Sequence, residues 1–434
     1  MKKSAINSLT FNFFILTIGN FVGRILGYAR EIIIVKIYGI NEISDNLNLL
    51  LISPDFINNF FSWSIIISTV LPYIAITNSV ELLNQIRNKI LLIAGILYLI
   101  YIFIHFQYSH INIFPIVIIT GTIFLNIYFS FTLVMAQKND NFLFTSLANF
   151  LYNFGVIFAL IFSGNNFILI SVIIFIFSFF RFYLSKIYNS YKNYNLMIEP
   201  SYDTPVEKLN FKNILLAILS QTVLGLIFLI DKFYASKLQV GTLTIYSLIE
   251  KLYLAPVTIV IVSSLSARYP SFVDIISDLK NKHFEYYLFF KKNMYLSIIL
   301  VIVLFFISPL IKYVFINFIG FSLNEINIII YYYRILLFDL IPYSIILFYV
   351  NHLLAQKKFL VLLFLALFSM SSKFILLLLF ANSLFNIVIL NIINHFITLF
   401  LVAFLFYKYE KDLYCYLWRR SFRYDRADFK GIWK

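Results

Sequence analysis

Twelve long apolar segments, separated by short polar connections, make up most of this chain. A bilayer-spanning helix needs about 20 mostly apolar residues, and lipid admits only helices and closed barrels. With 61% hydrophobic residues, the chain is predicted to be an all-α polytopic membrane protein of about twelve transmembrane helices. The expected segments are 9–37, 44–76, 88–106, 112–136, 142–163, 167–187, 213–236, 241–266, 290–316, 326–353, 359–381 and 384–407.

Lys and Arg gather in alternate connections, which sets the expected orientation. Cytoplasmic connections of membrane proteins carry an excess of Lys and Arg. Connections such as 107–110 and 163–166 are nearly free of Lys and Arg, whereas the connections that alternate with them carry most of these residues. We therefore expect a multi-pass protein with both termini in the cytoplasm and an uncleaved first helix. The net charge of +14 then indicates contact with anionic lipid, above all at the basic tail, and not with nucleic acid.

The two halves of the chain resemble each other. An offset of 202 residues pairs Arg30 with Lys232 and Gly39 with Gly241, and it also pairs Pro54 with Pro256. Halves of six helices have the same orientation, as in transporters whose site lies between two repeats. We expect an N-terminal six-helix lobe (1–187), a cytoplasmic linker (188–212), a C-terminal six-helix lobe (213–407), a basic cytoplasmic tail (408–434) and a central cavity.

The first apolar segment carries charges that lipid should exclude. A charge at mid-bilayer costs at least about 2.5 kcal/mol, so it is a functional hypothesis by default. Arg24, Arg30 and Lys36 exceed the single acidic residue of this segment, Glu31. One interpretation is an internal Arg–Glu pair that only locks helices together. The interpretation that we favour is a cationic site in a wet cavity, suited to a diphosphate because the Arg fork matches phosphate oxygens.

Charged residues recur in the second half. Glu250 and Lys251 lie deep in their segment, six and five residues before Pro256, and are candidates for the same site. Asp231 and Lys232 lie near a helix end, where side chains can reach the interface. Arg334 and Asp339 are about one helical turn apart, so that they can pair with each other.

Several functions have no support in the sequence. The five His residues are scattered, Cys415 is the only cysteine, and no phosphate-binding GxxxxGK[ST] loop is present. We therefore expect no cofactor, no metal site and no enzymatic activity. A monomer is the expected form.

The stretch GRILGYAREIIIVKIYGINEISDNLNLLLISPDFINNFF resembles the N-terminal signature of the MurJ (MviN) lipid II flippases, of the multidrug/oligosaccharidyl-lipid/polysaccharide exporter superfamily. The signature residues here are Arg24, Leu26-Gly27, Arg30, Tyr38-Gly39, Asp45 and Pro54. Glu250-Lys251 before Pro256 is similar to the family's cavity pattern, with Lys in place of Arg. The resemblance implies a lipid-linked cell-wall precursor flipped across the bacterial cytoplasmic (inner) membrane. It also implies Arg24, Arg30 and Lys251 as diphosphate-facing groups and Asp45 as a functional acidic residue.

Two departures from the family keep alternatives open. Asn58 and Asn59 occupy positions at which the family usually has paired Arg. Members of the family usually have fourteen transmembrane helices, whereas twelve are expected in this chain. Both Asn residues are candidate substrate-binding residues, with helix–helix hydrogen bonds as the alternative. The rival substrate is an O-antigen or capsule unit linked to undecaprenyl diphosphate. A cation-coupled drug exporter of the same fold and a membrane scaffold are further alternatives.

Overall fold

The computed structural model describes residues 2–56, 80–108, 112–138, 142–191 and 211–411, except for 263, 266–271, 274, 277 and 280. These residues form helices and short connections, with no strand among them, which confirms the predicted all-α class. Each of the twelve expected segments contains a helix. Asn58 and Asn59, most of the linker and most of the tail lie outside the described residues, as does the side chain of Arg24.

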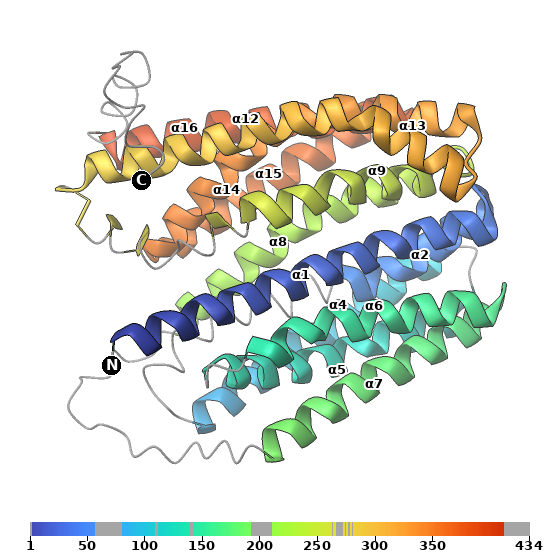
Figure 1. The fold of residues 1–434 in the computed structure, drawn as a ribbon, viewed down its shortest axis with the longest axis horizontal. Helices are drawn as coiled ribbons and strands as arrows, with labels where there is room; N and C mark the ends of the chain where they lie inside the picture. The colour runs from blue at the N-terminus through green and yellow to red at the C-terminus, as the bar shows by residue number, and fades with distance from the viewer. Residues whose placement is uncertain are drawn as a thin grey trace. The chain divides into compact units, whose positions relative to one another are not determined.

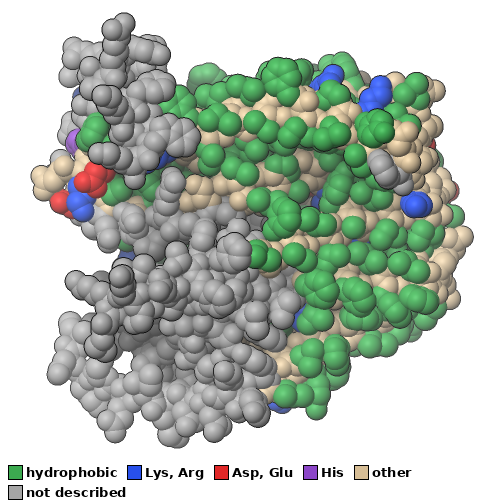
Figure 2. Space-filling view, in the orientation of Figure 1, with side chains coloured by type: hydrophobic (Ala, Val, Ile, Leu, Met, Phe, Trp, Pro, Cys, Tyr) green, Lys and Arg blue, Asp and Glu red, His purple; other side chains and the backbone are tan. Residues whose placement is uncertain are grey.

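Several helices are suited to lipid. Seven stretches of the described helices are long and apolar enough to cross a membrane, and an eighth span results if the bent pair Leu323–Leu337 and Leu340–Ala355 counts as one. Large apolar side chains face outward, among them Phe306 (76% exposed) and Phe400 (77% exposed). Figure 2 shows such side chains spread over the described helices. The chain is a multi-pass membrane protein.

The chain divides into two compact units, Met1–Lys251 and Leu252–Lys434. The predicted lobe boundary at 188–212 lies mostly outside the described residues, so the two six-helix lobes stay a prediction. The first unit contains α1 (Lys2–Tyr38), α2 (Glu42–Phe56), α4 (Val80–Tyr108), α5 (Ile113–Lys138), α6 (Phe142–Ser163), α7 (Phe167–Tyr191), α8 (Phe211–Ser236) and the start of α9 (Thr242–Val257), as drawn in Figure 1.

Close packing around α1 holds the first unit together. α1 packs along α6, α5 packs on α7, and α2 contacts both α5 and α8. α6 lies close to α1 at Gly23 and Gly27, where Asn153 donates a hydrogen bond to the carbonyl of Gly23 (2.9 Å) and lies against Gly27. Buried apolar residues from α1, α2, α5, α6 and α7 complete one core.

The paired positions of the two halves have matching backbone features. Gly39, directly after α1, and Gly241, directly before α9, lie in the connections that follow α1 and α8, with φ of 76° and 88°, a conformation that favours glycine. Pro54 and Pro256 both lie inside helices, α2 and α9. The 202-residue offset therefore relates positions of similar local structure.

The second unit continues from α9. It contains the π-helix η2 (Thr258–Val262), α12 (His283–Val314), the π-helix η3 (Phe315–Ile319), α13 (Leu323–Leu337), α14 (Leu340–Ala355), α15 (Phe359–Phe380) and α16 (Leu384–Tyr409). α15 packs on α16, while α14 contacts both α12 and α16. Aromatic rings fill one part of this core, where Phe348 contacts Phe272, Tyr286 and Phe289.

Candidate functional site

Arg30 is the centre of a buried charged cluster in the first unit. Its guanidinium donates to both carboxylate oxygens of Asp55, at 2.7 and 2.6 Å, and also to Glu31 at 2.6 Å. The side chain of Arg30 is 2% exposed, so these bonds replace the water that its charge has lost. α1 supplies Arg30 and Glu31, and α2 brings Asp55 to them from the other side.

Two lysines from the second half join this cluster. The ammonium of Lys251, on α9, lies 3.4 Å from the same Asp55 carboxylate. Lys232, on α8, binds Glu250 at 2.7 Å and interacts electrostatically with Asp55. The structure thus brings together three of the predicted site residues: Arg30, Glu250 and Lys251.

These residues form what we term the six-charge cluster: Arg30, Glu31, Asp55, Lys232, Glu250 and Lys251. It holds three cations and three carboxylates, joined by ion pairs whose N–O distances run from 2.6 to 3.4 Å. The expected positive excess is therefore not found among these six groups. Lys251 is the most exposed of them, at 21%, which makes its ammonium the most accessible cation of the cluster.

Asp55 was not among the predicted site residues, although it is the carboxylate that joins Arg30 to Lys251. The available signal was an acidic residue inside the second apolar segment, directly after Pro54. The expectation that Asp231 and Lys232 reach the interface is wrong. Both are buried, because Lys232 binds Glu250 and Asp231 accepts a hydrogen bond from the Tyr246 hydroxyl at 2.8 Å.

Asp45 joins the start of α2 to the start of α9. One carboxylate oxygen accepts from the backbone N–H of Gly241 (2.6 Å), and the other accepts from the N–H and hydroxyl of Thr244 (2.8 and 2.6 Å). Asp45 thus caps the N-terminus of α9, whose unpaired N–H groups and positive dipole end favour a carboxylate. The same turn packs tightly, since a Cβ at Gly241 would lie 2.6 Å from Ile40.

In the second unit, the possible pair of Arg334 with Asp339 is not formed. Arg334 donates to the hydroxyl of Ser308 at 2.8 Å and lies over the ring of Phe305. Asp339 is fully buried and binds His395 on α16 at 2.7 Å. Helical spacing placed these two charges near each other, but packing turns them toward different helices.

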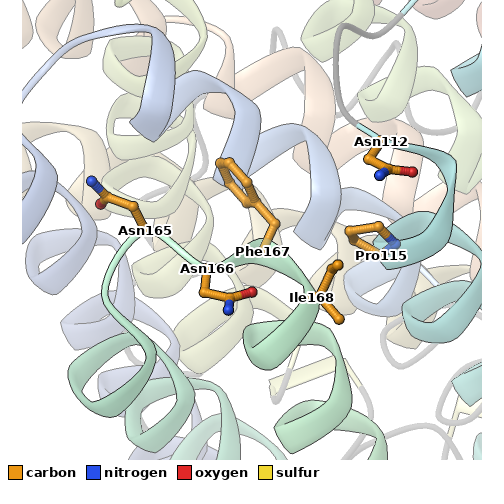
Figure 3. Close-up of a pocket in the computed structure, with 6 residues that line it drawn as sticks. All are labelled: Asn112, Pro115, Asn165, Asn166, Phe167 and Ile168. Carbon is orange, nitrogen blue, oxygen red and sulfur yellow. The ribbon is translucent and has the colours of Figure 1, made fainter.

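A surface pocket of about 330 Å³ lies at the end of the first unit where α6 and α7 meet. Figure 3 shows its lining residues, which come from the start of α5, the turn before α7 and the first residues of α7. Asn112 and Asn166 use their side-chain oxygens to accept backbone N–H groups at these helix starts. None of the predicted site residues lines this pocket.

No protein-family model matches this sequence, and no curated protein matches it. Solved structures do match it. The lipid II flippase MurJ in an inward closed conformation is 17% identical, with 93% of this chain and 90% of that chain covered and a TM-score of 0.72. A variant of the Vibrio cholerae MATE transporter VcmN is 13% identical, with 95% and 99% covered and a TM-score of 0.63. A Pyrococcus furiosus transporter of the MOP superfamily, described by a reversed polarity of its binding pocket, is 12% identical, with 91% and 95% covered and a TM-score of 0.58.

Proposed function

We propose that this chain, which has the fold of MurJ and of the MATE transporters, is a flippase. Its proposed substrate is a cell-wall precursor linked to undecaprenyl diphosphate, carried from the inner to the outer leaflet of the bacterial cytoplasmic membrane. Movement of the two lobes would expose the six-charge cluster to one side of the membrane and then to the other, while the lipid tail stays in the bilayer. No covalent bond of the substrate is broken in this cycle.

The convergence of Arg30 and Lys251 on one small anion carries this proposal. The Arg30 fork holds two oxygens of Asp55 in a planar bidentate arrangement, and Lys251 reaches the same carboxylate. A phosphate group offers oxygens in the same arrangement. A diphosphate that entered the cluster would therefore take the place of Asp55 on Arg30 and bind Lys251 with a second phosphate.

The joint at Asp45 supports a role in the same cycle. Its three accepted hydrogen bonds hold α2 against the start of α9, in turns that belong to opposite halves of the sequence. If these halves are the two lobes, the lobes must part here in one state of the cycle. Asp45, which the family resemblance implies to be a functional acidic residue, would then hold the two lobes together at this contact in the other state.

Reconstituted flipping of a lipid-linked diphosphate saccharide tests the proposal. A charge-assisted hydrogen bond contributes about 1.5–3 kcal/mol, so Arg30→Gln and Lys251→Gln should each reduce the rate at least about tenfold. Lys36→Gln is the matched control, because Lys36 is an exposed cation on the same helix as Arg30. Its rate should stay within about twofold of the wild type.

Loss of folding must be separated from loss of binding, since removal of one member of a buried pair costs about 3–5 kcal/mol. The double variant Arg30→Gln with Asp55→Asn removes the pair together and keeps the cluster neutral. Glu31 and Lys251 each lose one partner in it, so we expect it to insert and to be more stable than Arg30→Gln alone, yet to flip poorly. Full flipping by this double variant would overturn the diphosphate site.

Two observations favour a second candidate, a cation-coupled drug exporter. The MATE transporters share the fold, and Glu31, Asp55 and Glu250 supply carboxylates for a cation. Export of a cationic dye by the same proteoliposomes distinguishes the two functions.

Depletion of the protein in cells identifies the saccharide. Accumulated lipid II supports a cell-wall precursor as the substrate, and an accumulated O-antigen or capsule intermediate supports the rival glycan.

A further inference from the structure

The surface pocket of the first unit is separate from the six-charge cluster, since no residue of that cluster lines it. Figure 3 shows its six described lining residues: Asn112, Pro115, Asn165, Asn166, Phe167 and Ile168. The volume of about 330 Å³ lies at the lower end of the range for small-molecule sites, about 300–1,000 Å³. A pocket of this size suits a group as large as one sugar ring.

Three amide side chains supply the polar groups of the pocket. Asn112 and Asn166 use their side-chain oxygens to accept from backbone N–H groups at the starts of α5 and α7, at 3.2 and 3.0 Å. Because these bonds orient the two amides, their NH₂ groups remain as donors. Asn165 is exposed and adds both a donor and an acceptor. None of the six described lining residues is charged, so the pocket suits a neutral ligand with hydroxyl or amide groups.

Apolar surface lies beside these amides. Phe167 is half-buried and packs against the core of the first unit, which holds its ring in place. Pro115 is buried and adds a second rigid ring. The C–H groups on one face of a sugar ring carry a small positive charge, and the face of an aromatic ring is negative. A sugar therefore matches both the amide part and the apolar part of the pocket.

The turn that carries Asn165 is held in place. The Tyr38 hydroxyl, at the end of α1, donates to the carbonyl of Gly164 at 2.7 Å. Gly164 has a φ of 54°, a conformation that favours glycine. The N–H of Asn166 closes the turn on the carbonyl of Ser163 at 3.1 Å. A ligand therefore finds a formed site and has little ordering cost to overcome.

The pocket lies at the edge of an apolar surface. Ile113 and Phe114, in the first turn of α5, are exposed, and so are Ile168 and Leu169, in the first turn of α7. In the expected topology, the connections before α5 and α7 face away from the cytoplasm, because they are nearly free of Lys and Arg. A lipid whose headgroup entered the pocket would have apolar side chains beside its tail. The position thus suits a lipid-linked sugar in the outer leaflet.

We propose that this pocket is a saccharide-binding site on the outer face, and that it takes a neutral sugar of the flipped lipid after translocation. Hydroxyl or amide groups of the sugar bind the three Asn side chains, and one face of the ring packs on Phe167. The chemistry of the pocket supports saccharide binding by itself. The assignment of that saccharide to the transported lipid rests on the proposed flippase function.

Saturation-transfer nuclear magnetic resonance tests the binding step. The purified full chain is placed in lipid nanodiscs without sugar detergent, and the probe is the methyl glycoside of N-acetylglucosamine, a neutral sugar with hydroxyl groups and an amide. Asn165→Ala removes one amide and should weaken binding by about two- to tenfold. Phe167→Leu removes the ring but keeps an apolar side chain, and it should weaken binding by a similar factor.

Asn382→Ala is the matched control. Asn382 is an exposed Asn in the turn between α15 and α16, which is also expected on the outer face, and it does not line the pocket. This variant should bind the glycoside as tightly as the wild type. Melting temperatures show that Asn165→Ala and Phe167→Leu are folded when they are measured. Equal affinity of the wild type and both pocket variants, or no transfer to the glycoside in the wild type, would overturn the saccharide site.

The same sugar on a lipid diphosphate identifies the source of the saccharide. This measurement uses an Arg30→Gln background, which removes the contact that we propose for the diphosphate. The lipid tail concentrates the sugar at the membrane, so binding should be at least about tenfold tighter than that of the free glycoside. Asn165→Ala should weaken it by the same factor as before. Equal affinities for the free and the lipid-linked sugar would overturn the assignment to the transported lipid.

The glycoside experiment involves no transport, so its outcome is separate from that of the flipping assay. Arg30→Gln should bind the free glycoside as the wild type does while its flipping is reduced. Flipping without glycoside binding would overturn the pocket and leave the flippase function in place. Glycoside binding without flipping would overturn the flippase function and leave the saccharide site in place.

Discussion

Gly241 combines a left-handed backbone conformation with close packing in the first unit. Its φ of 88° favours glycine, and a Cβ there would lie 2.6 Å from the side chain of Ile40. Gly320 has the same φ of 88°, but a Cβ there would have no neighbour within 4 Å. The two positions therefore separate the cost of the backbone conformation from the cost of a steric clash.

We expect both Gly241→Ala and Gly320→Ala to destabilise the protein, and Gly241→Ala to do so more. The left-handed conformation costs each variant about 1–2 kcal/mol, and the overpacked contact adds about 1–3 kcal/mol at Gly241 only. Thermal unfolding of both variants in the same detergent measures the difference. Equal losses of melting temperature would mean that Ile40 moves to accommodate the added Cβ without loss of stability.

The sequence was sufficient to find individual charged residues but not their partners. Arg30 and Lys251 could be predicted because a charge within an apolar segment is visible in the sequence. Their common partner Asp55 depends on how α1, α2 and α9 pack, which no local pattern reveals. Arg334 shows the same limit, since spacing along one helix suggested Asp339 while packing gave it Ser308.

At the scale of elements, helices could be predicted and their interruptions could not. Segment length and hydropathy indicate a span, and each expected segment contains a helix. The segment expected at 326–353 contains the break between α13 and α14. Hydropathy does not reveal this break, because Pro342 and the buried Asp339 leave the segment apolar as a whole. The π-helices η2 and η3 were missed for a similar reason.

Glu410, just beyond α16, holds the end of that helix to the turn between α14 and α15. Burial alone would raise the pKa of Glu410, but hydrogen bonds from Gln356 (2.7 Å) and Lys358 (3.0 Å) lower it below its ordinary 4.5. The carboxylate thus stabilises the folded state at pH values above its ordinary pKa. This contribution is lost as the pH falls through the lowered pKa.

We therefore expect Glu410→Gln to lower the melting temperature more at pH 7 than at pH 3. The pair is partly exposed, with Lys358 33% accessible, so the loss at pH 7 should be below about 1 kcal/mol and smaller at high salt. Melting curves of wild type and variant at the two pH values measure it. A difference of equal size at both pH values would mean that Glu410 acts through packing and not through its charge.

At the scale of the whole molecule, the orientation in the membrane rests on the distribution of Lys and Arg. Cys415, the only cysteine, lies in the tail that we expect in the cytoplasm. A membrane-impermeant thiol reagent should therefore label it in inverted membrane vesicles but not in intact cells. Asn165→Cys in a Cys415→Ser background places a thiol in the exposed turn before α7 and should show the opposite pattern. Labelling of both positions from the same side would contradict the proposed topology.

The balance of the six-charge cluster has an electrical consequence. Each elementary charge that crosses a membrane potential of 100 mV gains or loses about 2.3 kcal/mol. Three cations and three carboxylates that move together carry no net charge, so voltage does almost no work on these groups in an empty carrier. A bound diphosphate with about two negative charges would change this by roughly 5 kcal/mol per 100 mV. In such a carrier the loaded step is electrogenic, and the return of these groups is electrically silent.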